Sequence, residues 1–171
     1  AEDMFSDCGE LRALDLSNMK MGKVKSMRRM VICCSSLQTL NVSGWDTSNV
    51  TDMSEAFAGC RLLEELDVSS FDTARVENFY GAFSGLEFVT ALDVGHFDTS
   101  AATNMDSMFD GNFSLMTLDV SGFNTAHVQN MNRMFTNCQN LIELDVSGFD
   151  TANVMTMDNM FEGCNMLAEL N

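Results

Sequence analysis

The sequence is short of basic residues. Nine Lys and Arg stand against 25 Asp and Glu among 171 residues, which gives a formal net charge of −16 at pH 7. Because contact with nucleic acid phosphates depends on Lys and Arg, this balance argues against a nucleic acid partner. Five of the nine bases fall within ten residues and form one basic segment in an otherwise acidic chain: Lys20, Lys23, Lys25, Arg28 and Arg29.

Long apolar runs are missing as well. No stretch of 18 consecutive apolar residues occurs, so the sequence predicts no membrane span. The opening residues, Ala1-Glu2-Asp3, do not resemble the charged and then apolar start of a signal peptide. Such a start is typical of a processed or excised segment.

Histidine is scarce, and this weighs against an enzyme. The two histidines, His96 and His127, lie at unrelated positions, and no nucleophile is placed to match either one. Serine is plentiful, but it recurs at repeated positions, whereas catalysis requires one constellation of unlike residues. We therefore expect no enzymatic activity, no catalytic residues and no cofactor.

What the sequence has in abundance is one tetrapeptide, Leu-Asp-Val-Ser. Intact or slightly altered copies follow one another at intervals of 26 residues, without insertion or deletion. A fixed period of this length is typical of a solenoid, in which each repeat packs on its neighbours. The intact copies occupy residues 66–69, 118–121 and 144–147, and altered copies begin at Leu14, Leu40 and Leu92.

Each repeat contains two patterns of secondary structure. The alternation of apolar and polar residues in Leu-Asp-Val-Ser predicts a half-buried strand. A column of capping residues, such as Asp52 and Asn78, then precedes apolar residues at helical spacing, as in Met53, Ala56, Phe57 and Cys60. Together they predict an α/β leucine-rich-repeat solenoid of about six 26-residue repeats, with a parallel sheet on one side and short helices on the other. We expect residues 1–171 to form a single solenoid domain that belongs to a longer array.

The repeat resembles a known family. Residues 45–53, residues 56–60, Leu63 and residues 66–69 closely resemble the BspA-like leucine-rich-repeat surface proteins, and the match extends over nearly the whole chain. The resemblance implies a secreted or surface-attached protein that takes part in adhesion and in binding host or matrix proteins. It brings no catalytic residues. The first repeat departs most from the pattern, with Lys20 in place of Asp.

The cysteines follow the repeat. Five of the six share one column, which also accepts Leu86 and Asn112, and a column of this kind is typical of buried positions. Column neighbours lie within the range that a disulfide permits, but they point in parallel, so we favour free thiols over cross-links. Spaced Cys and His ligands for zinc are absent. The column contains Cys8, Cys34, Cys60, Cys138 and Cys164.

Aspartates form a second column, on the outward side of the predicted strands. Stacked like charges of this kind suggest an acidic face for a basic protein or for Ca²⁺, and the alternative is a solvated face. Calcium is disfavoured because a site requires 6–8 converging oxygens, so we expect no metal. The candidate protein-binding residues of this column are Asp67, Asp93, Asp119 and Asp145.

Three apolar residues stand out from the repeat. Leu62, Phe88 and Phe113 occupy columns that elsewhere hold Ser, Asn, Arg or Glu, which predicts an exposed apolar patch that binds protein. The alternative is that these side chains fold over the return segment as ordinary packing.

These observations favour a non-enzymatic protein-binding or adhesion module of a secreted or cell-surface protein. A structural subunit of an extracellular filament or large assembly is the alternative. The expected partner is a protein, either a host or matrix protein or a second copy in head-to-tail or lateral contact. Three glycosylation sequons, at Asn41, Asn49 and Asn112, are left open because the repeat generates such triplets by chance.

Overall fold

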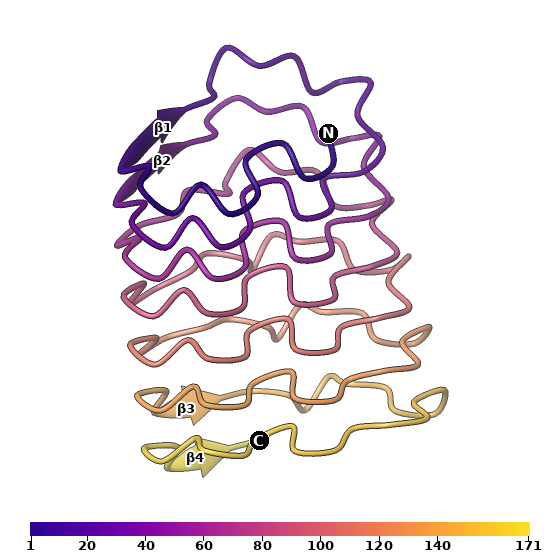
Figure 1. Cartoon of the computed structure of the whole chain (residues 1–171). Helices are drawn as coiled ribbons and strands as arrows, with labels where there is room; N and C mark the ends of the chain where they lie inside the picture. Colours follow the sequence, from indigo (N-terminus) through magenta and orange to yellow (C-terminus); the bar gives the residue numbers. More distant parts are fainter.

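The chain winds into a stack of coils along one axis. The computed structural model describes all 171 residues, and Figure 1 shows one coil per sequence repeat, from the first coils at the top to the last at the bottom. Every backbone bridge between coils joins residues that are 26 apart, for example Asp52 and Asn78. The period read from the sequence is therefore the length of one coil.

Regular strands are few and short. Strand β1 (Ala13–Asp15) pairs in parallel with β2 (Thr39–Asn41), and β3 (Glu143–Leu144) pairs in parallel with β4 (Glu169–Leu170). The coils between these pairs have no regular strand at the tetrapeptide, and they are joined there by a single bridge, from Ala91 to Thr117. The leucines still point inward and the aspartates outward, as the alternation predicts.

The predicted α/β architecture is wrong, because the structure contains no helix. The segments predicted as helices are successions of tight turns, which give the serrated traces on the near side of Figure 1. In one such segment Ala56 donates its N–H back to the carbonyl of Met53 at 3.1 Å, which closes a four-residue turn. The fold is a stack of repeated coils without a helical layer.

Hydrogen bonds to the next coil replace those of a helix. The backbone N–H groups of alternate residues, 53, 55, 57 and 59, donate to carbonyls 25 residues further on, at 2.7–3.1 Å. Two residues of this segment, Glu55 and Gly59, have positive φ angles of 53° and 71°. An α-helix excludes left-handed residues and uses the same N–H groups within itself, so the segment cannot be helical.

The spacing of the apolar residues is compatible with a helix and with successive tight turns. Met53, Ala56, Phe57 and Cys60 are fully buried, as the helical pattern required. Two consecutive four-residue turns bring the same residues inward as a helix does over this short length. The expected buried face is thus confirmed, while the conformation inferred from it is not.

The predicted capping column has a different role. Asp52 accepts the N–H of Ser54 at 2.9 Å, and Asn78 accepts that of Tyr80 at 3.0 Å. These bonds close Asx turns, which need the same side chains as a helix N-cap. The column also carries the bridges between successive coils.

One continuous core fills the stack. It consists of a cluster of 43 buried apolar residues that runs from Leu16 to Met160. Aromatic rings at the same position of successive coils stack on one another with centroids 5.7–6.0 Å apart: Phe57, Phe83, Phe109, Phe135 and Phe161.

A column of buried threonines joins the coils on another side. The Thr47 hydroxyl donates to the carbonyl of Asp72 at 2.9 Å and accepts the N–H of Asp72 at 2.8 Å. The Thr47 hydroxyl therefore satisfies both backbone polar groups of Asp72, and Thr99 does the same for Asn124. Thr73, Thr99 and Thr125 donate in the same way.

Candidate functional site

The candidate site is the strand face, which we define as the outward-facing side of residues 62–69, 88–95, 114–121 and 140–147. These four segments occupy the same position on consecutive coils and contain no Lys, Arg or His. They contain seven carboxylates, from Glu64, Glu65, Asp67, Asp93, Asp119, Glu143 and Asp145.

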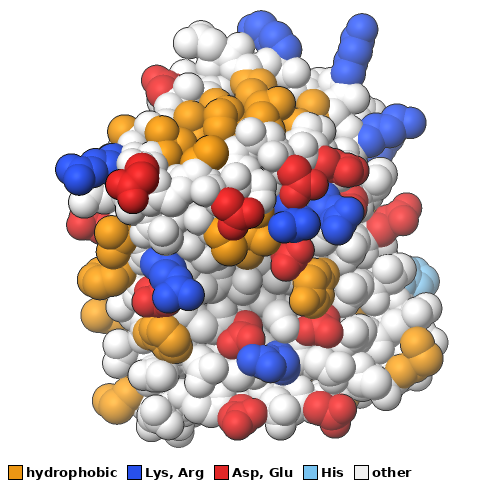
Figure 2. All heavy atoms as spheres, viewed as in Figure 1, with side chains coloured by type: hydrophobic (Ala, Val, Ile, Leu, Met, Phe, Trp, Pro, Cys, Tyr) orange, Lys and Arg blue, Asp and Glu red, His pale blue; other side chains and the backbone are white.

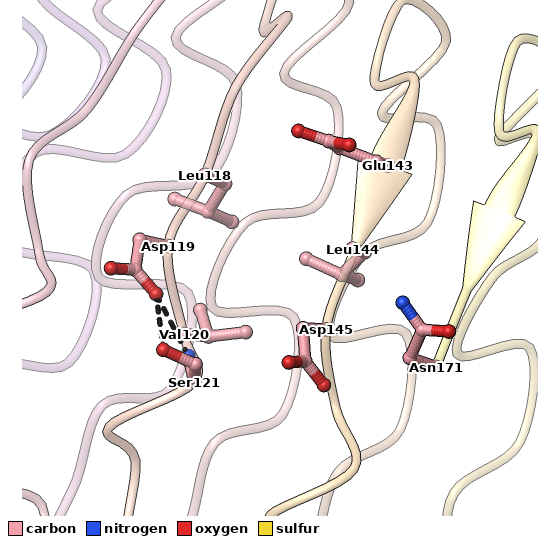
Figure 3. A pocket seen from close by; sticks show the side chains of 8 residues that line it. All are labelled: Leu118, Asp119, Val120, Ser121, Glu143, Leu144, Asp145 and Asn171. Carbon is pink, nitrogen blue, oxygen red and sulfur yellow. Dashed lines mark hydrogen bonds between the residues drawn. The ribbon is translucent and has the colours of Figure 1, made fainter.

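Four of these carboxylates form the acidic ladder, Asp67, Asp93, Asp119 and Asp145. All four side chains are exposed and lie at one position on successive coils. Figure 3 shows Asp119 and Asp145 side by side, with Asn171 at the same place on the following coil. A shallow hollow of about 330 Å³ runs between these coils and is also lined by Glu143 and Ser121.

Serine residues hydrogen-bond three of the four ladder carboxylates. The Ser121 hydroxyl donates to Asp119 at 2.7 Å, and the backbone N–H of the same serine donates at 3.0 Å. Side-chain and backbone hydrogen bonds from Ser69, Ser121 and Ser147 lower the pKa of Asp67, Asp119 and Asp145 respectively. These three carboxylates are therefore negatively charged at neutral pH.

An apolar row borders the ladder. It consists of one large exposed apolar side chain on each of five consecutive coils, in the residues that lead into the strand position. Three members lie five residues before the ladder column and two, Met116 and Ile142, lie three residues before it. In Figure 2, apolar side chains follow one another down the side of the molecule that carries the strands in Figure 1. The row comprises Leu62 (39% exposed), Phe88 (54%), Met116 (50%), Ile142 (53%) and Met166 (58%).

The structure separates the three apolar residues singled out from the sequence. Leu62 and Phe88 are exposed and belong to the apolar row, whereas Phe113 is half-buried and lies outside it. Met116, Ile142 and Met166 are additional members of the row. The column comparison that identified Leu62 also applies to these residues, because Met116 and Ile142 share a column with Arg12, Gln38, Glu64 and Thr90.

Nothing on the strand face is arranged to hold a metal. No group of three or more His, Cys, Asp or Glu side chains converges anywhere in the structure. The ladder carboxylates are spread along the stack, and three of them bind their own turn. A calcium site would need their oxygens to converge on one point.

The cysteine column is part of the core, where buried thiols donate hydrogen bonds to backbone carbonyls. All six cysteines are free. The thiol of Cys60 donates to the carbonyl of Val31 at 3.0 Å, and that of Cys34 donates to the carbonyl of Phe5 at 3.0 Å. A hydrogen bond with Cys34, together with burial, raises the pKa of Cys60 far above that of a free thiol.

The three sequons differ in their surroundings. Asn112 is buried, with 1% of its surface exposed, and its side-chain oxygen accepts the N–H of Leu86 at 2.8 Å. Asn49 donates its amide to the carbonyl of Gly22 at 3.0 Å, and Asn41 is exposed. Burial removes Asn112 from the candidates for a glycan on the folded chain.

Comparison with known proteins gives a family. A family model described as a Mycoplasma protein of unknown function, DUF285, matches residues 1–109 and again residues 80–170. The chain belongs to the DUF285 family. No curated protein matches this DUF285 chain.

A solved structure supports the fold of the DUF285 chain. The chain is similar, with a TM-score of 0.56 and 17% sequence identity, to a leucine-rich repeat protein from Bacteroides ovatus ATCC 8483. The match covers 100% of the DUF285 chain and 40% of the solved chain, so the chain spans less than half of that protein. The likeness shows a leucine-rich-repeat type of fold. No helix in the structure is long and apolar enough to cross a membrane.

Proposed function

We propose that this chain is a non-enzymatic protein-binding module that uses its strand face. The observation that carries the proposal is the apolar row, because it places one large exposed apolar side chain on each of five consecutive coils. Contiguous exposed apolar surface bordered by polar groups is typical of protein interaction sites. Catalytic, cofactor and metal roles have no counterpart in the residues of this face.

The surroundings of the row define the partner's chemistry. The row runs beside the acidic ladder, and the strand face contains no base to neutralise it. A protein surface that combines apolar contacts with Lys or Arg would satisfy both features, because charge complementarity steers association and fixes orientation. The proposed partner surface is therefore cationic and partly apolar.

The finer assignment rests on the sequence resemblance. We propose that the chain is a BspA-like repeat module of a secreted or cell-surface protein that works in adhesion. The leucine-rich-repeat type of fold supports this assignment.

Peptide display tests the proposal without a known partner. A random peptide library is selected against the wild-type chain, and the recovered peptides are measured against a Phe88→Ser/Ile142→Ser double variant. Both side chains are more than half exposed, so the variant should fold normally. We expect peptides rich in Lys, Arg and apolar residues that bind the wild type and lose most affinity for the variant. Peptides that bind both chains equally, or no enrichment of cationic sequences, would overturn the proposal.

A further inference from the structure

The charges of the chain are divided between two regions. Residues 1–40 contain six bases and five acids, a formal charge of +1, whereas residues 41–171 contain three bases and 20 acids, a formal charge of −17. Figure 2 shows Lys and Arg side chains projecting from the upper end of the stack, where the first coils lie. The molecule is thus strongly polarised along its axis.

Four of these bases form what we call the basic rim, Lys20, Lys23, Lys25 and Arg28. All four side chains are exposed. None has a carboxylate within ion-pair distance, whereas Arg29, Arg61 and Arg133 each pair with a carboxylate of their own chain. The rim therefore presents positive charge that the chain itself does not neutralise.

The rim is a local departure from the repeat. Lys20 stands where later coils have Asp46, Asp72 and Asp98, so the sign of the charge at this position is inverted. The side chains of Lys20 and Lys23 border an open hollow of about 700 Å³, which continues to Gly44 and Asp46. The hollow leaves the two lysines free to extend away from the stack.

We propose that the strand face binds the basic rim of a second copy of this chain. This inference rests on the proposed function, in which the strand face is the binding surface, and it identifies the protein that binds there. Two unneutralised surfaces of opposite sign are present on one molecule: a face with seven carboxylates and no base, and a rim of four unpaired bases.

The two surfaces also match in length. Lys20 to Lys25 is five residues, at most about 16 Å for a strand-like rise of about 3.3 Å per residue. Asp67 to Asp145 is three coil steps, about 14 Å at a strand spacing of about 4.8 Å. This stretch contains three of the four rim bases, so it can lie along the acidic ladder with its three lysines near three of the four carboxylates.

The apolar row completes the fit. Lysine and arginine bury their aliphatic stems on apolar surface while the charged end stays with polar partners. Rim side chains laid across Met116 and Ile142, which lie three residues before Asp119 and Asp145, would cover this part of the row and still reach the ladder. This accounts for an apolar row next to a line of charge.

The net charge of −16 does not prevent the contact. At physiological ionic strength the screening length is about 8 Å, so repulsion between distant acids is damped while the facing charges still attract. The contact joins two different surfaces and is therefore heterologous. Contacts of this kind generate rings or open filaments when they repeat from copy to copy.

Sedimentation measurements on charge-reversed variants test the proposal. The rim-reversed variant carries Lys20→Glu, Lys23→Glu, Lys25→Glu and Arg28→Glu. The face-reversed variant carries Glu64→Lys, Glu65→Lys and Glu143→Lys, three exposed glutamates with no side-chain hydrogen bond. A matched control carries Glu2→Lys, Glu77→Lys and Glu162→Lys, which make the same charge change at exposed positions elsewhere.

The wild type and the control should increase in mass with concentration at physiological ionic strength and return to monomers at about 1 M salt, where the screening length falls to about 3 Å. Each reversed variant alone should remain monomeric, because the rim-reversed variant has two acidic surfaces and the face-reversed variant keeps four aspartates against three new lysines, so its face no longer attracts the rim strongly. An equimolar mixture of the two reversed variants should associate again, which also shows that both are folded. A wild type that stays monomeric, a reversal without effect, or a mixture that does not associate would overturn the proposal.

Two further results separate this inference from the proposed function. If the wild type is monomeric but display-selected peptides still require Phe88 and Ile142, only the second copy as occupant is rejected. If the wild type associates and Phe88→Ser/Ile142→Ser leaves this association unchanged, the strand face is not the surface used, and the inference fails.

Discussion

Phe135 illustrates how single residues stabilise the stack. Its ring lies between those of Phe109 and Phe161, with centroid distances of 5.8 and 5.7 Å, and its side chain is fully buried. We expect Phe135→Ala to lower the free energy of unfolding by about 3–5 kcal/mol, because the change removes buried apolar surface and leaves a cavity. Denaturant unfolding followed by circular dichroism measures this loss.

An exposed phenylalanine is the control for this prediction. Phe88 is 54% exposed, so Phe88→Ala should change the free energy of unfolding much less than Phe135→Ala. Equal denaturant midpoints for Phe135→Ala and the wild type would contradict the assignment of the ring stack as core.

The hydrogen bond between Ser69 and Asp67 predicts a titration behaviour. Bonds from the Ser69 side chain and backbone lower the pKa of Asp67 below its ordinary value of 3.8. The stability gained from this bond is therefore fully present above pH 3.8 and is lost as the pH falls through the lower, folded-state pKa. In Ser69→Ala, carboxyl NMR should show the Asp67 midpoint moving up toward 3.8, while Asp145 serves as an unchanged reference. An unchanged Asp67 midpoint would show that the Ser69 hydroxyl is not the cause, because the variant keeps the backbone N–H of residue 69, which donates to Asp67 at 2.9 Å.

The cysteines should differ in reactivity. Cys33 is exposed, whereas Cys34, Cys60 and Cys138 are buried, and burial raises the pKa of Cys138 beyond the thiol range. A thiol reagent should modify Cys33 first in the native chain, and the buried thiols only after unfolding. Cys33→Ser should remove the fast phase.

Treatment with a reductant tests whether the same cysteines form disulfides. Because all six are free, a reductant should leave the thermal midpoint nearly unchanged, whereas loss of a disulfide in a folded protein typically costs about 2–5 kcal/mol. A large fall in the midpoint on reduction would show that the column is cross-linked.

At the scale of the element, the serrated turn is the unit that distinguishes this fold from a helical one. Glu55 has a φ of 53°, and the equivalent residue of the next coil is Gly81, with a φ of 55°. A left-handed residue with a side chain costs about 1–2 kcal/mol, and glycine avoids this cost. Glycine also loses more chain entropy on folding, which costs about 0.5–1 kcal/mol. The difference between the two terms predicts that Glu55→Gly is neutral or stabilises the fold by about 1 kcal/mol.

A helix would respond in the opposite direction. In a helix interior the same change would destabilise the chain by about 1 kcal/mol. Glu64→Gly, at an exposed position whose φ is not positive, is the matched control and should be destabilising. Chemical denaturation of both variants therefore separates the turn from the helix by the sign of the effect.

At the scale of the whole molecule, self-repulsion is the dominant charge effect. With a net charge of −16, the folded stack gathers like charges that an unfolded chain would spread apart. Raising the ionic strength from about 0.01 M to about 0.15 M shortens the screening length from about 30 Å to about 8 Å. The thermal midpoint should therefore rise with salt. It should rise less in a Glu2→Gln/Glu77→Gln/Glu162→Gln variant, and a midpoint that falls with salt would contradict this view.

The sequence alone determined the period and the direction of the side chains. A repeat without insertions fixes the length of a coil at 26 residues, and the columns of Phe, Leu, Cys and Val reveal which positions face the core. The outward acidic ladder followed from the same alternation. These features depend on local spacing, and the same spacing recurs in every repeat. Each repeat therefore gives independent support for the same assignment of buried and exposed positions.

Only the tertiary structure decided the conformation of the second half of each repeat. An apolar pattern such as Met53, Ala56, Phe57 and Cys60 is compatible with a short helix and with paired turns. The choice depends on whether the N–H groups of residues 53, 55, 57 and 59 bond within the segment or to the next coil. The partial burial of Phe113 was decided in the same way, because its column also holds Ser35 and Arg61 and predicted exposure, whereas its surroundings depend on how neighbouring coils stack.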